Sequence, residues 1–138
     1  AGGGDAAPAA EAKDSFDVFA GDDVVAGAFL AQGAVGCISV TANIAPAACA
    51  AQQNAWAAGQ MQEFQTLQSQ LMPLHRALFT ETSPAPVKYA ASRLGLCSDE
   101  VRLPLVPASS GCRTNLDKVM AECGLFENTS SAKLRARG

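Results

Sequence analysis

Two short β-prone segments, each followed by a helical segment, constrain the fold more than any other feature of this sequence. The segments 16–19 and 35–40 are rich in aromatic and β-branched residues, which predicts strands. An apolar stretch over 24–32 lies between them and ends at Gly33, which predicts a helix with a glycine stop. The second segment shows little apolar–polar alternation, which is typical of a parallel strand covered on both faces. The order therefore predicts a right-handed βαβ unit and an α/β fold.

Only helices are predicted after Gly59. Apolar residues recur every three or four positions at Met61, Phe64, Leu67, Leu71, Leu74 and Leu78, which is a helical period. Pro73 interrupts this helix and is expected to kink or split it. Two more helices are predicted, ending at Gly95 and Gly124. Two parallel strands leave both sheet edges unpaired, so we expect further strands, which this chain lacks, to complete the sheet.

Length and composition predict one globular domain without nucleic acid or membrane partners. The 138 residues are 49% apolar and 17% charged, which is not the composition of a disordered chain. The net charge of -3 gives no basis for binding nucleic acid or an anionic bilayer. The sequence contains no run of about 18 apolar residues, so no membrane span is predicted. No signal peptide is predicted either. We therefore expect a cytoplasmic protein.

The cysteines do not form a recognisable framework. There are five, Cys37, Cys49, Cys97, Cys112 and Cys123, an odd number at irregular spacing. No pair has the CxxC spacing of a zinc site. We expect reduced thiols that are mostly buried, and neither a metal nor a cofactor.

The sequence divides into four predicted parts. Residues 1–14 predict a flexible Ala/Gly-rich leader or a helix remnant, and residues 15–58 hold the two βα units. Residues 59–125 predict a helical domain. Residues 126–138 predict a disordered tail.

Chemistry in a parallel α/β fold is expected at the C-terminal ends of the strands. Gly21 follows the first strand and allows a ligand to approach the backbone closely. Backbone amides near Ile38 and Thr41, at the end of the second strand, could bind a carboxylate. The simpler interpretation is that Gly21 forms a turn.

The remaining polar residues near these strand ends have structural interpretations. Asp22, Asp23 and Asn43 are interpreted as helix caps, and no histidine or further carboxylate at ligand spacing supports a metal at the aspartates. His75 is predicted to be a surface residue, far from either strand end. None of the four lysines follows a strand, where a Schiff-base nucleophile would be expected.

Several motifs, taken together and in order, resemble one enzyme family. They are FAGDD, GAVGCISVTANIAP and LMPLHRALFTETSPAPVKYAASRLGLCSDEVRLPLVP. The stretch from about Phe16 to Leu125 resembles the C-terminal half of the dihydrodipicolinate synthase family, whose members are also called 4-hydroxy-tetrahydrodipicolinate synthases.

The resemblance implies a fold, an activity and two site residues. Family members are TIM barrels with a C-terminal helical extension and are usually homotetramers. They condense pyruvate with aspartate semialdehyde in lysine biosynthesis, through a Schiff base on a lysine. The chain would then be a partial TIM (β/α)8 barrel, its strands the seventh and eighth, followed by a three-helix extension. Gly21 and Ile38 match residues that line the pyruvate pocket, and no catalytic residue is assigned.

The sequence also departs from the family pattern. The family's Schiff-base lysine belongs to the strand before Phe16, and its proton-relay tyrosines belong to earlier strands. A complete barrel needs about 250 residues. Ser83 stands where the family usually has asparagine. The resemblance therefore implies a fragment of a Schiff-base lyase that is inactive alone.

Two alternatives remain open. The chain could belong to a related pyruvate-dependent aldolase that acts on sialic acid or a keto-deoxy sugar acid. It could instead be a non-catalytic assembly module whose helices pack on a partner, because a half-barrel exposes apolar surface.

Overall fold

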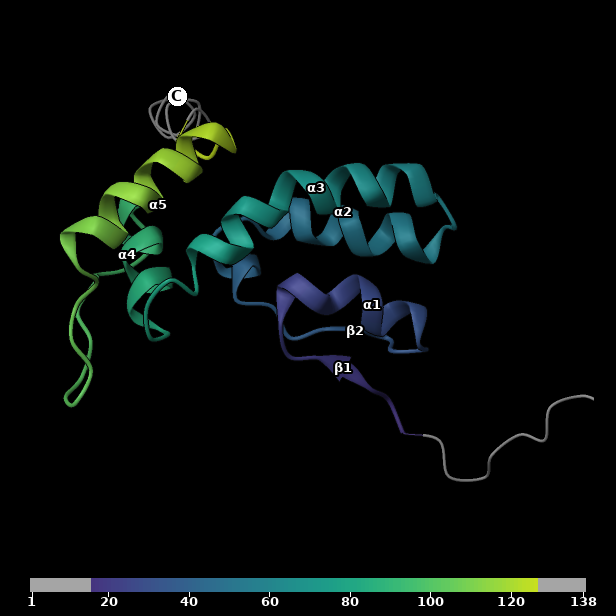
Figure 1. The fold of residues 1–138 in the computed structure, drawn as a ribbon, viewed down its shortest axis with the longest axis horizontal. Helices are drawn as coiled ribbons and strands as arrows, with labels where there is room; N and C mark the ends of the chain where they lie inside the picture. Colours follow the sequence, from purple (N-terminus) through teal and green to yellow (C-terminus); the bar gives the residue numbers. More distant parts are fainter. Residues whose placement is uncertain (1–15, 127–138) are drawn as a thin grey trace, which may run out of the picture.

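The computed structural model describes residues 16–126. The predicted leader (1–14) and all of the predicted tail (126–138) except Phe126 lie outside the described residues. The elements follow in the order β1 (Phe19–Ala20), α1 (Ala26–Ala31), β2 (Gly36–Cys37), α2 (Pro46–Ala57), α3 (Met61–Ala77), α4 (Ala85–Arg93) and α5 (Ser110–Glu122). Two 3-10 turns, η1 (Asp23–Val25) and η2 (Thr41–Asn43), follow the strand ends. The fold is thus α/β, mostly helical, with one small parallel sheet (Figure 1).

The two strands pair in parallel, as predicted, but each is shorter than the predicted segment. Phe19 pairs with Gly36 and Ala20 with Cys37. The amide of Ile38 then donates to the carbonyl of Ala20 at 2.8 Å, which carries the ladder one step further. Helices α1, α2 and α3 lie on one side of the strand pair (Figure 1). Within residues 16–126 both outer edges of this sheet are unpaired.

The helix boundaries follow local sequence signals. Gly33, Gly95 and Gly124 follow α1, α4 and α5 with φ values of 96°, 74° and 70°. Such positive angles are easily adopted only by glycine, so these predicted stops are confirmed. Ser109 caps α5 by accepting a hydrogen bond from the Cys112 amide at 3.2 Å. None of the described helices combines the length and apolarity needed to cross a bilayer.

Helix α3 is not split at Pro73. It continues over 17 residues with the proline inside it. Proline removes one amide donor from a helix interior, which usually destabilises the helix. Burial of Leu71, Leu74 and Leu78 offsets that loss, because these side chains are at most 5% exposed.

The buried residues form two clusters that join the βα units to the helices. The larger cluster contains the fully buried Leu74, Leu78, Leu116 and Met120. It also includes Ile44, which precedes α2. The smaller cluster contains Leu30, Ala55 and Phe64, and the Trp56 and Phe64 rings meet edge to face with centroids 5.2 Å apart. Each cluster therefore contains residues from both the predicted βα units (15–58) and the predicted helical domain (59–125).

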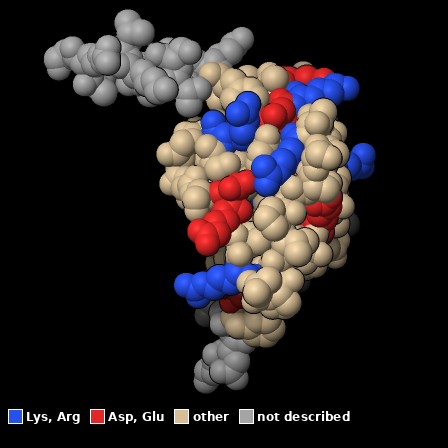
Figure 2. All heavy atoms as spheres, turned by 90° about the vertical axis from the view of Figure 1, so that its left-hand side faces the viewer, with Lys and Arg blue, Asp and Glu red and all other residues tan. Residues whose placement is uncertain are grey.

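Acidic and basic side chains are interspersed on the face that carries α4 and α5 (Figure 2). Arg93 pairs with Asp117 at 2.8 Å, and the Tyr89 hydroxyl donates to the same carboxylate at 3.0 Å. Arg113 pairs with Asp99 at 2.8 Å. Because these ion pairs are partly exposed, each contributes at most about 1 kcal/mol to stability.

Truncation of Leu116 tests the larger cluster. Leu116→Ala removes a side chain with no solvent exposure and is expected to lower the free energy of unfolding by about 2–5 kcal/mol. Leu103→Ala is the matched control, because Leu103 is 90% exposed, and its effect should stay within about 0.5 kcal/mol. Urea unfolding followed by circular dichroism measures both. Equal effects of the two substitutions would contradict this description of the core.

Candidate functional site at the strand ends

The structure brings Gly21 and Ile38 together at the C-terminal end of the sheet. The register that pairs Ala20 with Cys37 makes Gly21 and Ile38 the next pair along the ladder. The Ile38 side chain is 69% exposed, and a Cβ added at Gly21 would meet nothing within 4 Å. The two predicted site residues are therefore neighbours with open space around them.

The two faces of the sheet differ in what covers them. Side chains alternate between faces along a strand, so Gly36 and Ile38 share one face while Cys37 and Ser39 share the other. The Phe19 ring lies over Gly36, where an added Cβ would approach it to 3.2 Å. Phe19 is 48% exposed. Phe19 and Ile38 are thus exposed on the face that also carries Gly36, which is buried beneath the Phe19 ring, and we call this face the open face.

Asp23 connects the two strand ends through three hydrogen bonds. Its Oδ2 accepts from the amides of Val40 at 2.9 Å and Thr41 at 3.2 Å, and its Oδ1 accepts from the Ser39 hydroxyl. The carboxylate is buried, with the residue 4% exposed. A carboxylate that accepts several backbone amides is well stabilised at such a site.

Of the amides predicted to bind a carboxylate, that of Thr41 does so, but the carboxylate belongs to Asp23 of the same chain. The Thr41 amide donates to Asp23, and the Ile38 amide donates to the carbonyl of Ala20. Both donors are satisfied by the chain itself, because the first strand end lies directly beside the second.

Two of the three predicted caps are wrong. Asp22 does cap η1, accepting from the Val24 amide at 2.9 Å. Asp23 instead bonds across to the other strand end. Asn43 does not cap α2: its amide nitrogen donates to the Val40 carbonyl at 2.9 Å, and α2 begins at Pro46 without a side-chain cap. The tight η2 turn keeps Asn43 one turn away from the start of α2.

His75 is buried, so the prediction of a surface histidine is wrong. It is 1% exposed, and its Nδ1 lies 2.7 Å from the Thr41 hydroxyl oxygen at the end of the second strand. The helical period offers the missed signal. Position 75 lies four residues after Leu71 and three before Leu78, on the side of α3 that faces the core.

The environment of His75 favours the neutral imidazole. Burial lowers the pKa of His75 below its usual 6.5, and the nearby Asp23 and Asp22 oppose this shift only in part. Among residues 16–126, no group bonds to its Nε2. A proton on this ring would therefore place a charge in a site with little to stabilise it.

Cys37 and Cys49 line a pocket of about 240 Å³ behind the strand ends, together with Asp23 and Ser39. Burial, reinforced by the Asp23 carboxylate, raises the pKa of Cys37 to about 11. Burial also raises the pKa of Cys49. These thiols are therefore poor nucleophiles at neutral pH.

All five cysteines are free, but the expectation that they are mostly buried is wrong. Only Cys112 is buried, and Cys97 is exposed. Within residues 16–126, no group of three or more His, Cys, Asp or Glu side chains could hold a metal ion.

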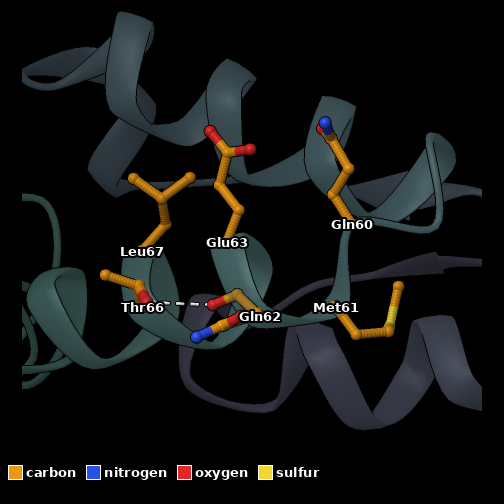
Figure 3. A pocket seen from close by; sticks show the side chains of 6 residues that line it. All are labelled: Gln60, Met61, Gln62, Glu63, Thr66 and Leu67. Atoms are coloured by element: carbon orange, nitrogen blue, oxygen red, sulfur yellow. Dashed lines mark hydrogen bonds between the residues drawn. The ribbon is translucent and has the colours of Figure 1, made fainter.

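A larger pocket, of about 610 Å³, lies at the start of α3, away from the strand ends. It is lined by Gln60, Met61, Gln62, Glu63, Thr66 and Leu67. The side chains extend from one end of the helix without converging on a common point (Figure 3). The Thr66 hydroxyl already donates to the Gln62 carbonyl at 2.9 Å. This pocket contains neither Gly21 nor Ile38, so we place the candidate site at the strand ends.

Comparison with known proteins identifies the family. A model of the dihydrodipicolinate synthetase family matches residues 7–123, which is most of the chain. The chain belongs to the dihydrodipicolinate synthetase family. The family match begins earlier than the resemblance at Phe16 and ends close to the expected Leu125.

Curated relatives in the dihydrodipicolinate synthetase family are longer than this chain. A 4-hydroxy-tetrahydrodipicolinate synthase of Rhodospirillum centenum is 52% identical over 116 residues, covering 84% of this chain and 40% of the relative. The synthase of Parvibaculum lavamentivorans is 52% identical over 111 residues, covering 80% and 38%. The chain thus spans about two fifths of the length of these relatives.

Solved structures of the family agree with the fold. The dihydrodipicolinate synthase of Thermotoga maritima superposes with a TM-score of 0.78 at 38% identity, covering 80% of this chain and 37% of that one. The synthase of Aquifex aeolicus gives 0.78 at 36% identity, covering 81% and 38%. A structure described as a monomeric dihydrodipicolinate synthase variant also gives 0.78 at 38% identity, covering 80% and 37%.

Acid should destabilise the protein through His75. An unfolded histidine takes up a proton near pH 6.5, whereas the folded one takes it up only at lower pH because its pKa is lowered. Its contribution to stability is therefore complete above pH 6.5 and is lost as the pH falls below that value, by at most about 1.4 kcal/mol per pH unit.

His75→Asn is the control, because asparagine retains a polar group near Thr41 and does not titrate. The free energy of unfolding, measured in urea from pH 7.5 to 5, should fall more steeply in the wild type than in this variant. Equal slopes in the two proteins would contradict the assignment of a neutral, buried His75.

Proposed function

We propose that the chain is the C-terminal part of a 4-hydroxy-tetrahydrodipicolinate synthase, which condenses pyruvate with aspartate semialdehyde in lysine biosynthesis. In this proposal β1 and β2 are the seventh and eighth strands of a (β/α)8 barrel, and α3 to α5 form the C-terminal extension. The single observation that best supports it is the open face, where Gly21 and Ile38 lie side by side at the strand ends. The family match and the 52% identity to named synthases support the same reading.

The open face suits the interior of a barrel. In a complete barrel, one face of every strand points inward and is covered by the other strands. Here Phe19 and Ile38 are exposed on that face, and the sheet edges are unpaired within the described residues. The remaining strands would cover these side chains and pair with both edges. Gly21 and Ile38 would then line a pyruvate pocket at the mouth of the barrel.

The chain alone is proposed to be inactive. A Schiff base requires an amine at the pocket, and none of the four lysines, Lys13, Lys88, Lys118 and Lys133, directly follows β1 or β2. The complete enzyme would supply the amine and the proton-relay tyrosines from the preceding strands. Its assembly into homotetramers is likewise a proposal, and a monomeric variant occurs among the structural relatives.

Trapping with borohydride tests the chain itself. Pyruvate is added with sodium borohydride, which reduces any Schiff base to a stable secondary amine, and the intact chain is weighed. We expect no mass increase, because none of the four lysines directly follows β1 or β2 in the sequence. A pyruvyl adduct on any lysine would contradict the proposal that the Schiff-base amine belongs to the preceding strands of the complete enzyme.

A chimera tests the proposed activity. Residues 16–126 would replace the matching segment of the Rhodospirillum centenum synthase, which leaves the rest of that enzyme to supply the missing strands. We expect the chimera to condense pyruvate with aspartate semialdehyde and to be trapped by borohydride in the presence of pyruvate. A folded chimera that forms the adduct but accepts only a sialic acid or a keto-deoxy sugar acid would favour the related aldolases.

The open face also favours a second candidate, a non-catalytic assembly module. Its exposed apolar residues would then pack on an intact synthase subunit. Size-exclusion chromatography of the chain with and without the Rhodospirillum centenum synthase distinguishes the two. Co-elution with the intact enzyme would favour the module, whereas separate elution favours a barrel segment whose missing strands must be supplied by the same polypeptide.

A further inference from the structure

Three hydrogen-bond donors from one turn converge on a single buried carboxylate. Asp23 receives the Ser39 hydroxyl on Oδ1 and the amides of Val40 and Thr41 on Oδ2. Ser39 in turn accepts from the Ala42 amide at 2.8 Å. The three partners of Asp23 and Ala42 all belong to the turn that directly follows Ile38, so the carboxylate determines the course of the backbone there.

The separation in sequence shows that these bonds are not a local cap. The partners of Asp23 lie 16 to 18 residues away along the chain. The neighbouring Asp22 caps its own turn through Val24, two residues on. Asp23 therefore connects the end of β1 with the end of β2. The ladder of the parallel strands makes no such connection beyond Ile38.

His75 bonds to the same turn through the side chain of Thr41. Its Nδ1 bonds to the Thr41 hydroxyl at 2.7 Å, while the Thr41 amide bonds to Asp23. Thr41 has no solvent exposure and is thus held by both groups. Because α3 carries His75, the turn is tied to the helical core as well as to the first strand.

We propose that Asp23 is a positioning residue that holds the turn after β2, with His75 as its second anchor, so that Ile38 stays on the open face beside Gly21. Neither residue touches that face itself. A shift of the turn by one residue would exchange the faces of Ile38 and Ser39, because neighbouring side chains of a strand point to opposite sides. The carboxylate and the imidazole oppose such a shift.

Only the consequence for pyruvate rests on the proposed function. The geometric role of Asp23 concerns the chain alone and can be measured without activity. The two parts of the test below can therefore fail independently.

The first test is nuclear magnetic resonance of the full chain. In the wild type the three donors share the two carboxylate oxygens of Asp23. Asp23→Asn leaves only one acceptor oxygen, so at least one donor in the turn loses its partner. We expect the amide shifts of residues 38–42 and the Ile38 methyl shift to change. Amide exchange at Val40 or Thr41 should accelerate by about tenfold or more.

Asp22→Asn is the matched control. It makes the same substitution at the adjacent residue and removes the same charge, yet its bond goes only to Val24. Shifts in residues 38–42 should remain close to those of the wild type. If both variants change that turn equally while both remain folded, or if neither does, the positioning role is overturned.

The second test uses the chimeric enzyme. A positioning role predicts that Asp23→Asn raises the KM for pyruvate by about three- to tenfold with a smaller change in kcat. A merely structural role would reduce the active fraction and hence kcat, with KM unchanged. His75→Leu should resemble Asp23→Asn, and His75→Asn should restore part of the loss because its amide can bond to Thr41.

The outcomes separate the two proposals. An inactive wild-type chimera that folds would contradict the proposed function, and the magnetic resonance result would still decide the role of Asp23. An active chimera in which Asp23→Asn lowers only kcat would overturn the positioning role and leave the proposed function intact.

Discussion

The buried carboxylate of Asp23 is the interaction on which the candidate site depends. Two parallel strands of two residues each cannot define the path of the chain beyond their last ladder bond. The bonds from Asp23 to Ser39, Val40 and Thr41 extend that definition into the following turn. Burial strengthens these bonds, because charge-assisted hydrogen bonds gain from a surrounding of low dielectric constant.

Helix α3 takes part in this arrangement through His75. Leu74 and Leu78 anchor α3 in the larger cluster, and the same helix delivers His75 to the strand ends. Burial of the helical core and placement of the turn are thus coupled through one element.

The open face links the structure to the proposed function. A parallel sheet is usually covered on both sides, and here only the side lined by Cys37 and Ser39 meets helices. Phe19 and Ile38 on the other side remain exposed. The family members whose structures resemble this chain are longer, and about three fifths of their length has no counterpart here. We propose that this additional length covers the open face.

Local and short-range features were predictable from the sequence. Gly33, Gly95 and Gly124 end their helices in a left-handed backbone conformation, which few other residues adopt. The positions of these glycines in the sequence therefore predict the helix ends directly. The parallel strand pair and the helical period of α3 follow from apolar spacing. The family follows from motifs that are contiguous in the sequence.

Only the tertiary structure decided which polar groups meet. Asp22 and Asp23 are identical neighbours, yet one caps its own turn and the other spans to Val40 and Thr41. The helical period places His75 on the core side of α3, but no local pattern specifies its bond to Thr41, 34 residues away. Sequence determines local backbone preferences and the periodicity of burial, whereas long-range polar contacts depend on how the strand ends and α3 pack together.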